Sequence, residues 1–343
     1  MPHIVRIDHS GHQFIVNDGE TVLEAALRQD IVLPYGCRNG ACGSCMGTLL
    51  TGQVHYDDAR IPALTDDDQS QNRALFCQAR PVTDLTIEVR EIDTTGDIEV
   101  KTLPCRVAHL NAIAHDVMEI KLKLPAAERL QFLAGQYIEI LLKDNRRRGF
   151  SIANAPHDDD FIVLQVRQVE GGYFSEFVFN QMQEKALLRL EGPLGTFYLR
   201  ENSSRPIILI GGGTGFAPLK GMIEHAFFTG MTRPMHLFWG VRAKQDLYSD
   251  LPEQWEHDYA NFTYTPVLSE PLPEDNWAGE TGLVTDSVVR HYPDLNDHEI
   301  YVSGPPVMIE AGKNLFFNHG MQQEHMYSDA FEFAPRTDSP SQD

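Results

Sequence analysis

The spacing of four cysteines constrains this chain more than any other feature. Cys37, Cys42, Cys45 and Cys77 follow the pattern C-x4-C-x2-C with a distant fourth member. The chain holds 5 cysteines, an odd number that cannot pair completely into disulfides. Their uneven bunching favours a metal centre in a reducing compartment, which predicts a cytoplasmic protein. The surrounding segment is therefore expected to fold about a bound metal.

The ligand spacing also indicates which metal group is held. Plant-type ferredoxins bind a [2Fe–2S] cluster with this spacing. Two irons need four thiolates, and a tight loop lets backbone N–H groups point at the sulfurs. A structural zinc ion, the weaker alternative, would favour a second C-x2-C pair. Cys105 stands alone and is expected to be a small buried hydrophobe. Glycines suit the tight loop, at positions 36, 40, 43 and 47.

Charge and hydropathy exclude several classes of partner. The chain has 28 Lys+Arg against 49 Asp+Glu, a net charge of −21, which opposes binding to nucleic-acid phosphates. Its N-terminus has no apolar signal region, and apolar runs such as Ile207 to Ile210 are too short to span a membrane. We therefore expect no nucleic-acid partner and no membrane span.

Three segments differ in pattern and predict three domains. Residues 1–97 contain no lysine, and a capping-box pattern from Thr21 to Glu24 predicts a helix through Leu27. After a polar linker, short alternating runs over 101–202 predict an antiparallel β-barrel. Over 205–334, apolar runs alternate with helix-length segments, which predicts a parallel α/β sheet. The tail, 335–343, is expected to be disordered.

Two sites for phosphate-bearing ligands are indicated by local chemistry. The run from Arg146 to Ser151 is a dense cationic stretch in an acidic chain, and it could pair with a diphosphate. Further on, a buried strand enters a glycine-rich turn and then a helix, a layout that places a pyrophosphate at a helix N-terminus. The strict G-x-G-x-x-G fingerprint fails there, because Phe216 occupies the last glycine position.

The cationic run belongs to a pair of motifs. Arg148-Gly-Phe-Ser151 followed by Gly172-Tyr-Phe-Ser175 resembles the R-x-Y-S and G-x-x-S flavin motifs of the ferredoxin reductase family, with Phe150 in place of the usual Tyr. The resemblance implies that Arg148 binds the flavin pyrophosphate, that Phe150 stacks near the ring and that Ser151 faces N5. It further implies a phosphate-binding segment made of Gly172, Tyr173, Phe174 and Ser175.

The C-terminal segment resembles the nicotinamide domain of the same family. Its glycine turn matches the family's dinucleotide turn, and Tyr301 to Met308 matches a second family motif. Ser303 stands where many members have Cys beside the place of hydride transfer, so an altered hydride-transfer rate is expected. The ending at Phe331 resembles a D-A-F terminus whose Phe lies against the flavin; an ordinary core aromatic is the alternative. Dinucleotide contacts implied by the resemblance are Gly212, Gly213, Thr214, Gly215, Gly304 and Pro305.

Taken over residues 1 to about 333, the chain resembles iron–sulfur flavoprotein reductases that carry an N-terminal plant-type ferredoxin domain. The implied fold is multidomain: a β-grasp α+β ferredoxin domain, an antiparallel flavin barrel and an α/β nucleotide domain. Families with this order include reductases of phenol hydroxylase, methane monooxygenase and ring-hydroxylating dioxygenases, and CDP-6-deoxy-3,4-glucoseen reductases. The D-A-F ending favours the last.

The implied function is electron transfer. A nicotinamide gives up two electrons together and an iron–sulfur cluster accepts one, so a flavin must stand between them. We expect FAD, a [2Fe–2S] cluster, NADH rather than NADPH, and a protein acceptor that is a sugar dehydratase or an oxygenase component. The residues after the second strand of the nucleotide domain give opposing indications for the nucleotide. The cations Arg242 and Lys244 favour the 2′-phosphate of NADPH, whereas Asp246 favours the ribose 2′-OH of NADH.

Other interpretations remain open from the sequence. A non-catalytic redox-sensing or electron-carrier module would keep the scaffold without turnover, and a free-flavin reductase would leave the ferredoxin domain unexplained. The pair His9 and His12 and the triplet from Asp66 to Asp68 could in principle bind a cation, but no ligand pattern extends either. Both are expected to be solvated, the triplet in a loop.

Overall fold

The chain divides into two units. One comprises Met1–Ile98 together with Gly195–Phe197 and Ser328–Ala330, and the other comprises the rest. The computed structural model describes residues 2–40, 42–57, 61–92, 98–143 and 146–331. The expected disordered tail and residues 93–97 of the linker expected over Glu91–Lys101 lie outside the described residues.

The first unit is a small mixed sheet packed against a helix. Its five-stranded sheet has the order β2-β1-β7-β3-β5, with β1 antiparallel to β2 and parallel to β7. Helix α1 begins as predicted, since Thr21 accepts from the Glu24 N–H and the Glu24 carboxylate accepts from the Thr21 N–H. Alternate side chains of β1, such as Val5 and Ile7, are fully buried. The elements are β1 His3–Ile7, β2 Gln13–Val16, α1 Val22–Arg28, β3 Met46–Thr51, β4 Val54–His55, α2 Asp66–Ser70, β5 Arg73–Leu75, β6 Arg80–Pro81 and β7 Leu85–Glu88.

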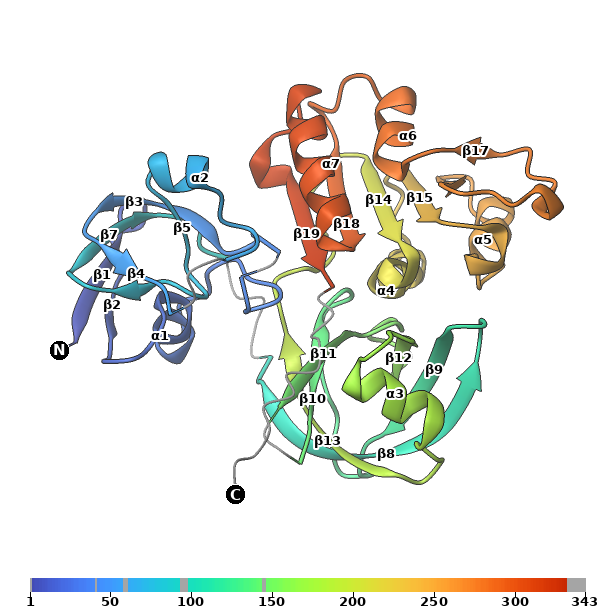
Figure 1. The fold of residues 1–343 in the computed structure, drawn as a ribbon, viewed down its shortest axis with the longest axis horizontal. Coiled ribbons are helices and arrows are strands. Elements are labelled where there is room, and N and C mark those ends of the chain that lie inside the picture. The colour runs from blue at the N-terminus through green and yellow to red at the C-terminus, as the bar shows by residue number, and fades with distance from the viewer. Residues whose placement is uncertain (1, 41, 58–60, 93–97, 144–145, 332–343) are drawn as a thin grey trace. The chain divides into compact units, whose positions relative to one another are not determined.

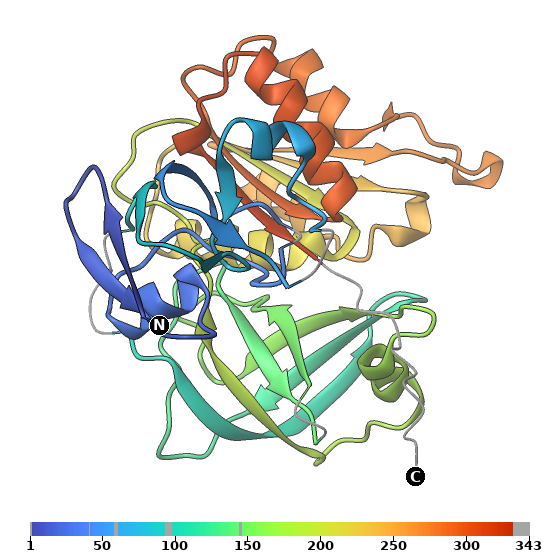
Figure 2. The same ribbon diagram turned by 60° about the vertical axis from the view of Figure 1, so that its left-hand side comes forward.

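The second unit contains a six-stranded antiparallel sheet of order β11-β10-β13-β8-β9-β12. Its longest strand, β8, pairs with β13 on one side and β9 on the other, and the register with β9 shifts between Val107 and His109. Such a shift bends a strand, and the curvature of this sheet is visible in Figure 2. The elements are β8 Lys101–Ala112, β9 Val117–Lys123, β10 Tyr137–Leu141, β11 Arg147–Ser151, β12 Ile162–Arg167, α3 Tyr173–Asn180 and β13 Leu187–Leu194.

A second six-stranded sheet, of order β17-β16-β15-β14-β18-β19, is flanked by helices (Figure 1) and belongs to the same unit except for Ser328–Ala330 of β19. The ladders of β14 with β15 and β18, and of β16 with β15 and β17, are parallel, as predicted. All residues of β14 and β18 are buried, which explains their apolar runs. The elements are β14 Ile207–Gly212, η1 Gly213–Gly215, α4 Phe216–Phe228, β15 Met235–Val241, η2 Lys244–Asp246, α5 Leu251–Asp258, β16 Phe262–Leu268, η3 Pro273–Asp275, β17 Glu280–Thr281, α6 Val284–His291, β18 Glu299–Gly304, α7 Pro306–Asn318, η4 Gln323–His325 and β19 Met326–Ala330.

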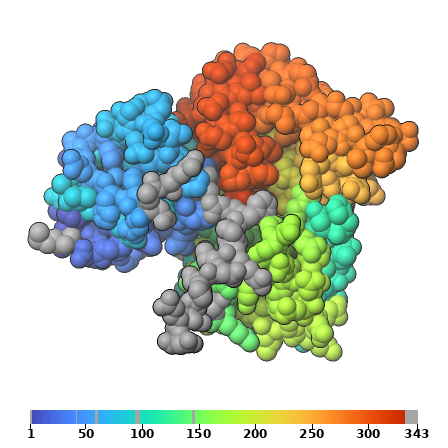
Figure 3. All heavy atoms as spheres, in the orientation of Figure 1, coloured from blue at the N-terminus to red at the C-terminus, as the bar shows by residue number. Residues whose placement is uncertain are grey.

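The acidic triplet differs from its prediction. Asp66, Asp67 and Asp68 form the first turn of helix α2 rather than a loop. Thr65 accepts from the Asp68 N–H while the Asp68 carboxylate accepts from the Thr65 N–H, so a capping box starts the helix. The carboxylates also lie at the positive end of the helix dipole. The short helix has no buried residue and lies at the surface in Figure 3.

A buried ion pair stabilises the parallel sheet. Arg233, 8% exposed, donates to Glu299, 2% exposed, over 2.6 Å and also to the carbonyls of Arg200 and Arg205. Glu299→Ala would leave the Arg233 charge uncompensated, so we expect a loss of about 3–5 kcal/mol in the free energy of unfolding. Urea denaturation followed by tryptophan fluorescence measures it; an unchanged midpoint would show that the pair does not stabilise the sheet.

Among the described residues, none of the helices has the length and apolar character needed to cross a membrane.

Candidate functional site

The structure brings the four predicted metal ligands together in pairs. Cys37 and Cys42 exchange N–H···S hydrogen bonds, over 3.4 Å and 3.3 Å between nitrogen and Sγ. The Cys77 N–H points at the Cys45 Sγ over 3.5 Å, and the Ser44 N–H donates to the Cys42 Sγ over 3.4 Å. Three of the four cysteines are buried and Cys37 is half-buried. Four thiol ligands with amide donors around them fit a [2Fe–2S] cluster.

Hydrogen bonds between the thiols of this loop give them different acidities. The hydrogen bond from Cys37, together with the Ser44 N–H, lowers the pKa of Cys42, and the same partnership raises the pKa of Cys37. Burial raises the pKa of Cys105 to about 12, since no partner offsets its desolvation. Cys105 is thus a buried thiol outside the loop, as predicted.

The loop's tight path depends on glycine at Gly40. Its φ is +86°, and a Cβ there would lie 2.6 Å from a methyl carbon of Ile61. A side chain at this position would therefore meet both backbone strain and a clash. The predicted need for glycine in this loop is confirmed at Gly40.

The two flavin motifs of the sequence also lie side by side. Arg148, Phe150 and Ser151 belong to β11, and the second motif begins helix α3. The ring centroids of Phe150 and Phe174 are 5.1 Å apart, which joins the motifs directly. The Arg146 guanidinium lies 4.2 Å from the Tyr173 ring centroid. Cationic and aromatic side chains thus gather around β11 and the start of α3.

The Ser175 hydroxyl makes contacts within its own turn. It accepts from the Val169 N–H over 3.2 Å and can donate to the carbonyl of Gly172 or Val169. Helix α3 starts at Gly172 without a side-chain cap, so its first N–H groups are presented for an external acceptor. In this arrangement the Ser175 hydroxyl shapes the turn.

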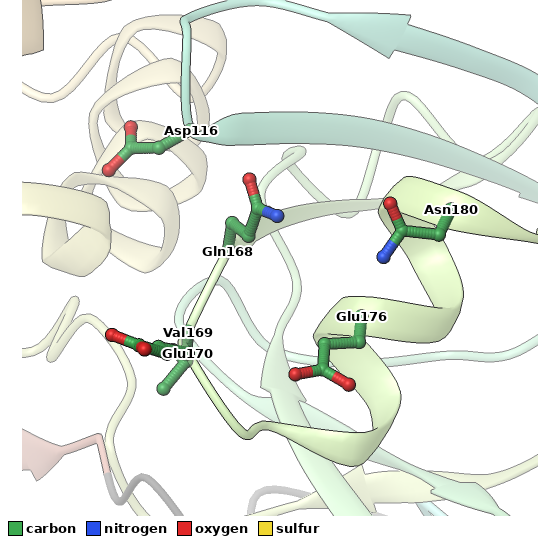
Figure 4. Close-up of a pocket in the computed structure, with 6 residues that line it drawn as sticks. All are labelled: Asp116, Gln168, Val169, Glu170, Glu176 and Asn180. Carbon is green, nitrogen blue, oxygen red and sulfur yellow. The ribbon is translucent and has the colours of Figure 1, made fainter.

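A neighbouring pocket of about 380 Å³ does not suit a phosphate. Figure 4 shows Glu176 and Asn180 on α3, with Gln168, Val169 and Glu170 on the preceding loop and Asp116 beside them. Three carboxylates line this space, and they oppose an anionic ligand. The pocket is therefore not suited to the phosphate that the motif is expected to bind.

The glycine turn after β14 packs tightly against the end of β18. A Cβ on Gly215 would lie 2.0 Å from the Ser303 carbonyl oxygen, so a side chain cannot fit there. The Trp239 indole N–H donates to the Gly213 carbonyl over 2.9 Å, which fixes the turn further. The structure thus brings the turn Gly212–Gly215 beside Ser303, as the resemblance implies.

The end of β18 carries the other predicted nicotinamide residues. Ser303 is fully buried, and within the described part of the chain its hydroxyl oxygen has no hydrogen-bond partner. Pro305 caps the start of α7, and the Gly304 carbonyl accepts from the Phe331 N–H over 2.9 Å. An unsatisfied buried hydroxyl is uncommon in native structures, and here it lies at the end of β18 beside the glycine turn.

Sequence reasoning missed Arg167, the last residue of β12. Its Nε donates to the Asp116 carboxylate over 2.7 Å, and its Nη1 lies 2.5 Å from where a Cβ on Gly213 would stand. The guanidinium therefore covers the glycine turn, held there by a carboxylate. The available signal was a single charge that ends an otherwise uncharged strand.

Asp246, one of the three residues that bear on the choice of nucleotide, is buried in the structure. An acidic residue after this strand would favour a ribose hydroxyl, but Asp246 is only 3% exposed and accepts from the Ala243 N–H over 3.1 Å. Its other oxygen lies 3.8 Å from both Arg167 and His115. One carboxylate oxygen thus starts η2, and the other, which has no hydrogen-bond partner among the described residues, lies near the Arg167 charge.

Comparison with known proteins places three family domains along the chain. Residues 5–82 match a 2Fe-2S iron-sulfur cluster binding domain, residues 104–198 an oxidoreductase FAD-binding domain and residues 209–314 an oxidoreductase NAD-binding domain. Together they define an NAD(P)H oxidoreductase with FAD and [2Fe–2S] cofactors and a ferredoxin reductase-like multidomain fold.

Full-length relatives identify the family. CDP-6-deoxy-L-threo-D-glycero-4-hexulose-3-dehydrase reductase of Yersinia pestis is 38% identical over 327 residues, 95% of this chain and 98% of the relative. Terephthalate 1,2-dioxygenase reductase component 2 of Comamonas sp is 32% identical over 98% of this chain and 99% of its own length. The solved ferredoxin reductase in carbazole 1,9a-dioxygenase is 27% identical, with a TM-score of 0.70 over 97% of this chain and 99% of its own. The chain belongs to this family of iron–sulfur flavoprotein reductases.

Proposed function

We propose that this protein is an NADH-dependent reductase that passes electrons one at a time to a sugar dehydratase acting on a CDP-linked hexulose. The observation that carries this proposal is the joint presence of the paired cysteines, the Phe150–Phe174 flavin motif and the glycine turn in one chain. When bound, FAD accepts a hydride and releases single electrons, and the cluster carries them singly.

The chain's own residues bind and orient these groups. Arg148 neutralises the flavin diphosphate together with the Gly172–Ser175 turn, while Phe150 packs at the ring and Ser151 offers its hydroxyl to N5. The glycine turn holds the dinucleotide, with the Ser303 hydroxyl and Phe331 beside the reacting ring. Cys37, Cys42, Cys45 and Cys77 ligate the cluster.

An anaerobic titration with NADH tests this assignment. Wild-type protein should need about three electrons per chain, two for one flavin and one for one cluster, to bleach both visible absorptions. Bleaching of the flavin alone would place the cluster outside the electron path. Absorptions that do not respond to NADH would overturn the proposal.

We assign the Arg167 guanidinium to the dinucleotide diphosphate, since it lies over the glycine turn already oriented by Asp116. Arg167→Ala should raise the KM for NADH roughly tenfold to a hundredfold, as expected for the loss of a charge-assisted hydrogen bond. Steady-state kinetics measure this. The control is Arg129→Ala, which removes an exposed arginine paired with Asp159 and should leave the KM unchanged. Equal values for both variants would refute the assignment.

The preference for NADH rests on charges beside the end of β15. Arg242 and Lys244 could accommodate a 2′-phosphate, but their backbone groups bond to an acidic segment: the Glu270 N–H donates to the Arg242 carbonyl, and the Lys244 N–H donates to the Asp275 carboxylate. The carboxylates of this segment oppose an added phosphate. The proposal fails if kcat/KM for NADPH exceeds that for NADH by tenfold.

The protein that accepts the electrons is proposed to be a sugar dehydratase rather than an oxygenase component. The 38% identity to the Yersinia relative favours a dehydratase, whereas the Comamonas relative favours an oxygenase component. Reduction assays with a purified CDP-hexulose dehydratase and with a dioxygenase component separate the two. Turnover with the oxygenase component alone would replace the proposed acceptor.

Finer points of architecture and location complete the proposal. We place domain boundaries at 1–97, 101–202 and 205–334, with a β-grasp ferredoxin domain.

The antiparallel sheet closes as a barrel in this proposal. Closure is supported by the hydrogen bond from the Ala153 N–H to the Val163 carbonyl over 2.8 Å, which links the end of β11 to β12. A cytoplasmic location is supported by the five cysteines, all of them described, since they form no disulfide.

A further inference from the structure

Two short segments far along the chain hold the cysteine loop. Gly195–Phe197 and Ser328–Ala330 belong to the first unit by their contacts, although the rest of that unit is the first 98 residues. Each segment bonds to one end of the loop from Tyr35 to Cys45, which carries three of the four cysteine ligands. The two segments lie more than 100 residues apart in the sequence, so each makes its contact separately.

The first contact fixes the entrance of the loop. The Thr196 hydroxyl accepts from the Tyr35 N–H over 2.9 Å and donates to the Tyr35 carbonyl over 2.9 Å. The Thr196 N–H donates to the same carbonyl, also over 2.9 Å. Both residues are buried, at 8% and 7% exposure, so these bonds are shielded from water. Tyr35 lies two residues before the ligand Cys37.

The second contact fixes the exit. Ser44 lies between the ligands Cys42 and Cys45, and its hydroxyl donates to the Ser328 carbonyl over 3.0 Å. Its backbone N–H donates to the Cys42 Sγ over 3.4 Å. One residue therefore couples the position of a sulfur-directed amide to a segment 284 positions away.

Both segments are covalently continuous with the second unit. Thr196 follows closely on β13, which ends at Leu194. Ala330 is followed by Phe331, whose N–H donates to the Gly304 carbonyl within the second unit. The chain that carries the proposed flavin and nicotinamide contacts thus runs without a break into the segments that hold the loop.

We propose that Thr196 and Ser44 are positioning residues that hold the cysteine loop in one arrangement, and so set the reduction potential of the cluster and the rate at which it is reduced. The N–H···S bond of Ser44 acts on the potential, because donors to the sulfurs stabilise the reduced, more negative cluster. The step affected is the one in which reduced flavin loses one electron and the cluster gains it. This inference rests on the proposed function.

The test uses the full-length holoprotein in three variants. Thr196→Val removes both hydroxyl bonds at constant volume, Thr196→Ser restores them, and Ser44→Ala removes the exit contact. Anaerobic stopped-flow absorbance separates flavin reduction by NADH from cluster reduction, and EPR-monitored titration gives the cluster's midpoint potential. We expect Thr196→Val and Ser44→Ala to slow cluster reduction about tenfold, in line with the loss of buried hydrogen bonds, with flavin reduction unchanged. Thr196→Ser should match wild type.

Matched controls remove a hydroxyl elsewhere in the same unit. Thr86→Val lies on strand β7, and Ser70→Ala removes a hydroxyl that donates to the Asp67 carbonyl on helix α2. Both should behave as wild type in every readout. Loss of the cluster in Thr196→Val, with its retention in Thr196→Ser, would also support the proposal. Identical potentials, EPR spectra and rates in the anchor variants and controls would overturn it.

The outcome is distinguishable from failure of the proposed function. If wild-type protein holds no reducible cluster, iron and sulfide analysis reports it before any variant is compared, and the proposed function fails. If wild type transfers electrons normally and the anchor variants do too, only the positioning role fails.

Discussion

Gly215→Ala is expected to abolish efficient reduction of the protein by NADH. The added Cβ would stand 2.0 Å from the Ser303 carbonyl oxygen, a contact that only a shift of the backbone can relieve. Such overpacking costs about 3 kcal/mol, and moving the turn would lower the affinity for NADH about a hundredfold. Stopped-flow measurement of flavin reduction at low NADH concentrations gives the effect directly.

The control for this variant is Gly230→Ala in the same domain. Gly230 has φ +71°, and a Cβ added there would have no atom within 4 Å, so the substitution adds only about 1 kcal/mol of backbone strain. It should reduce stability slightly and leave flavin reduction intact. If Gly215→Ala retains visible flavin and cluster absorption and is still reduced at the wild-type rate, the turn does not bind the dinucleotide.

The sequence predicted the local signals of this fold well. The capping box at Thr21, the buried parallel strands and the cysteine pairing all depend on residues close together in the chain or on ligand chemistry that tolerates few alternatives. The same reasoning could have found the helix over Asp66–Ser70, since Thr65 and Asp68 have capping-box spacing. Three consecutive carboxylates are also typical of a solvated loop, which is why a loop is predicted there from the sequence.

Contacts between distant segments could not be predicted in the same way. Arg167 contacts the glycine turn only because the fold brings the end of β12 close to the turn that follows β14. No local sequence pattern predicts that contact. The burial of Asp246 could not be predicted from its spacing after β15 either, because its neighbours there include Arg167 and the Ala243 N–H. Thr196 and Ser328 carry no motif at all. Polar residues that act through long-range hydrogen bonds require the three-dimensional structure.

Cys77→Ser should separate the two halves of the reaction. Cys77 is buried after β5, with its N–H directed at the Cys45 Sγ, and it is the ligand farthest in sequence from the other three. Replacing a soft thiolate by an alcohol removes one of the four ligands that two irons need. We expect cluster content and acceptor reduction to fall by about a hundredfold or more, while NADH reduces the flavin at the wild-type rate. The anaerobic titration should then require about two electrons per chain instead of about three.

Cys105→Ser provides the matched control, because it makes the same chemical change at a buried cysteine outside the cluster loop. Its hydroxyl would be buried in the core on β8, so we expect a loss of about 1–3 kcal/mol in stability with full cluster content. A cluster of normal EPR signature in Cys77→Ser would remove Cys77 from the ligand set. Loss of the cluster in both variants would indicate that its retention depends on core stability rather than on ligation by Cys77.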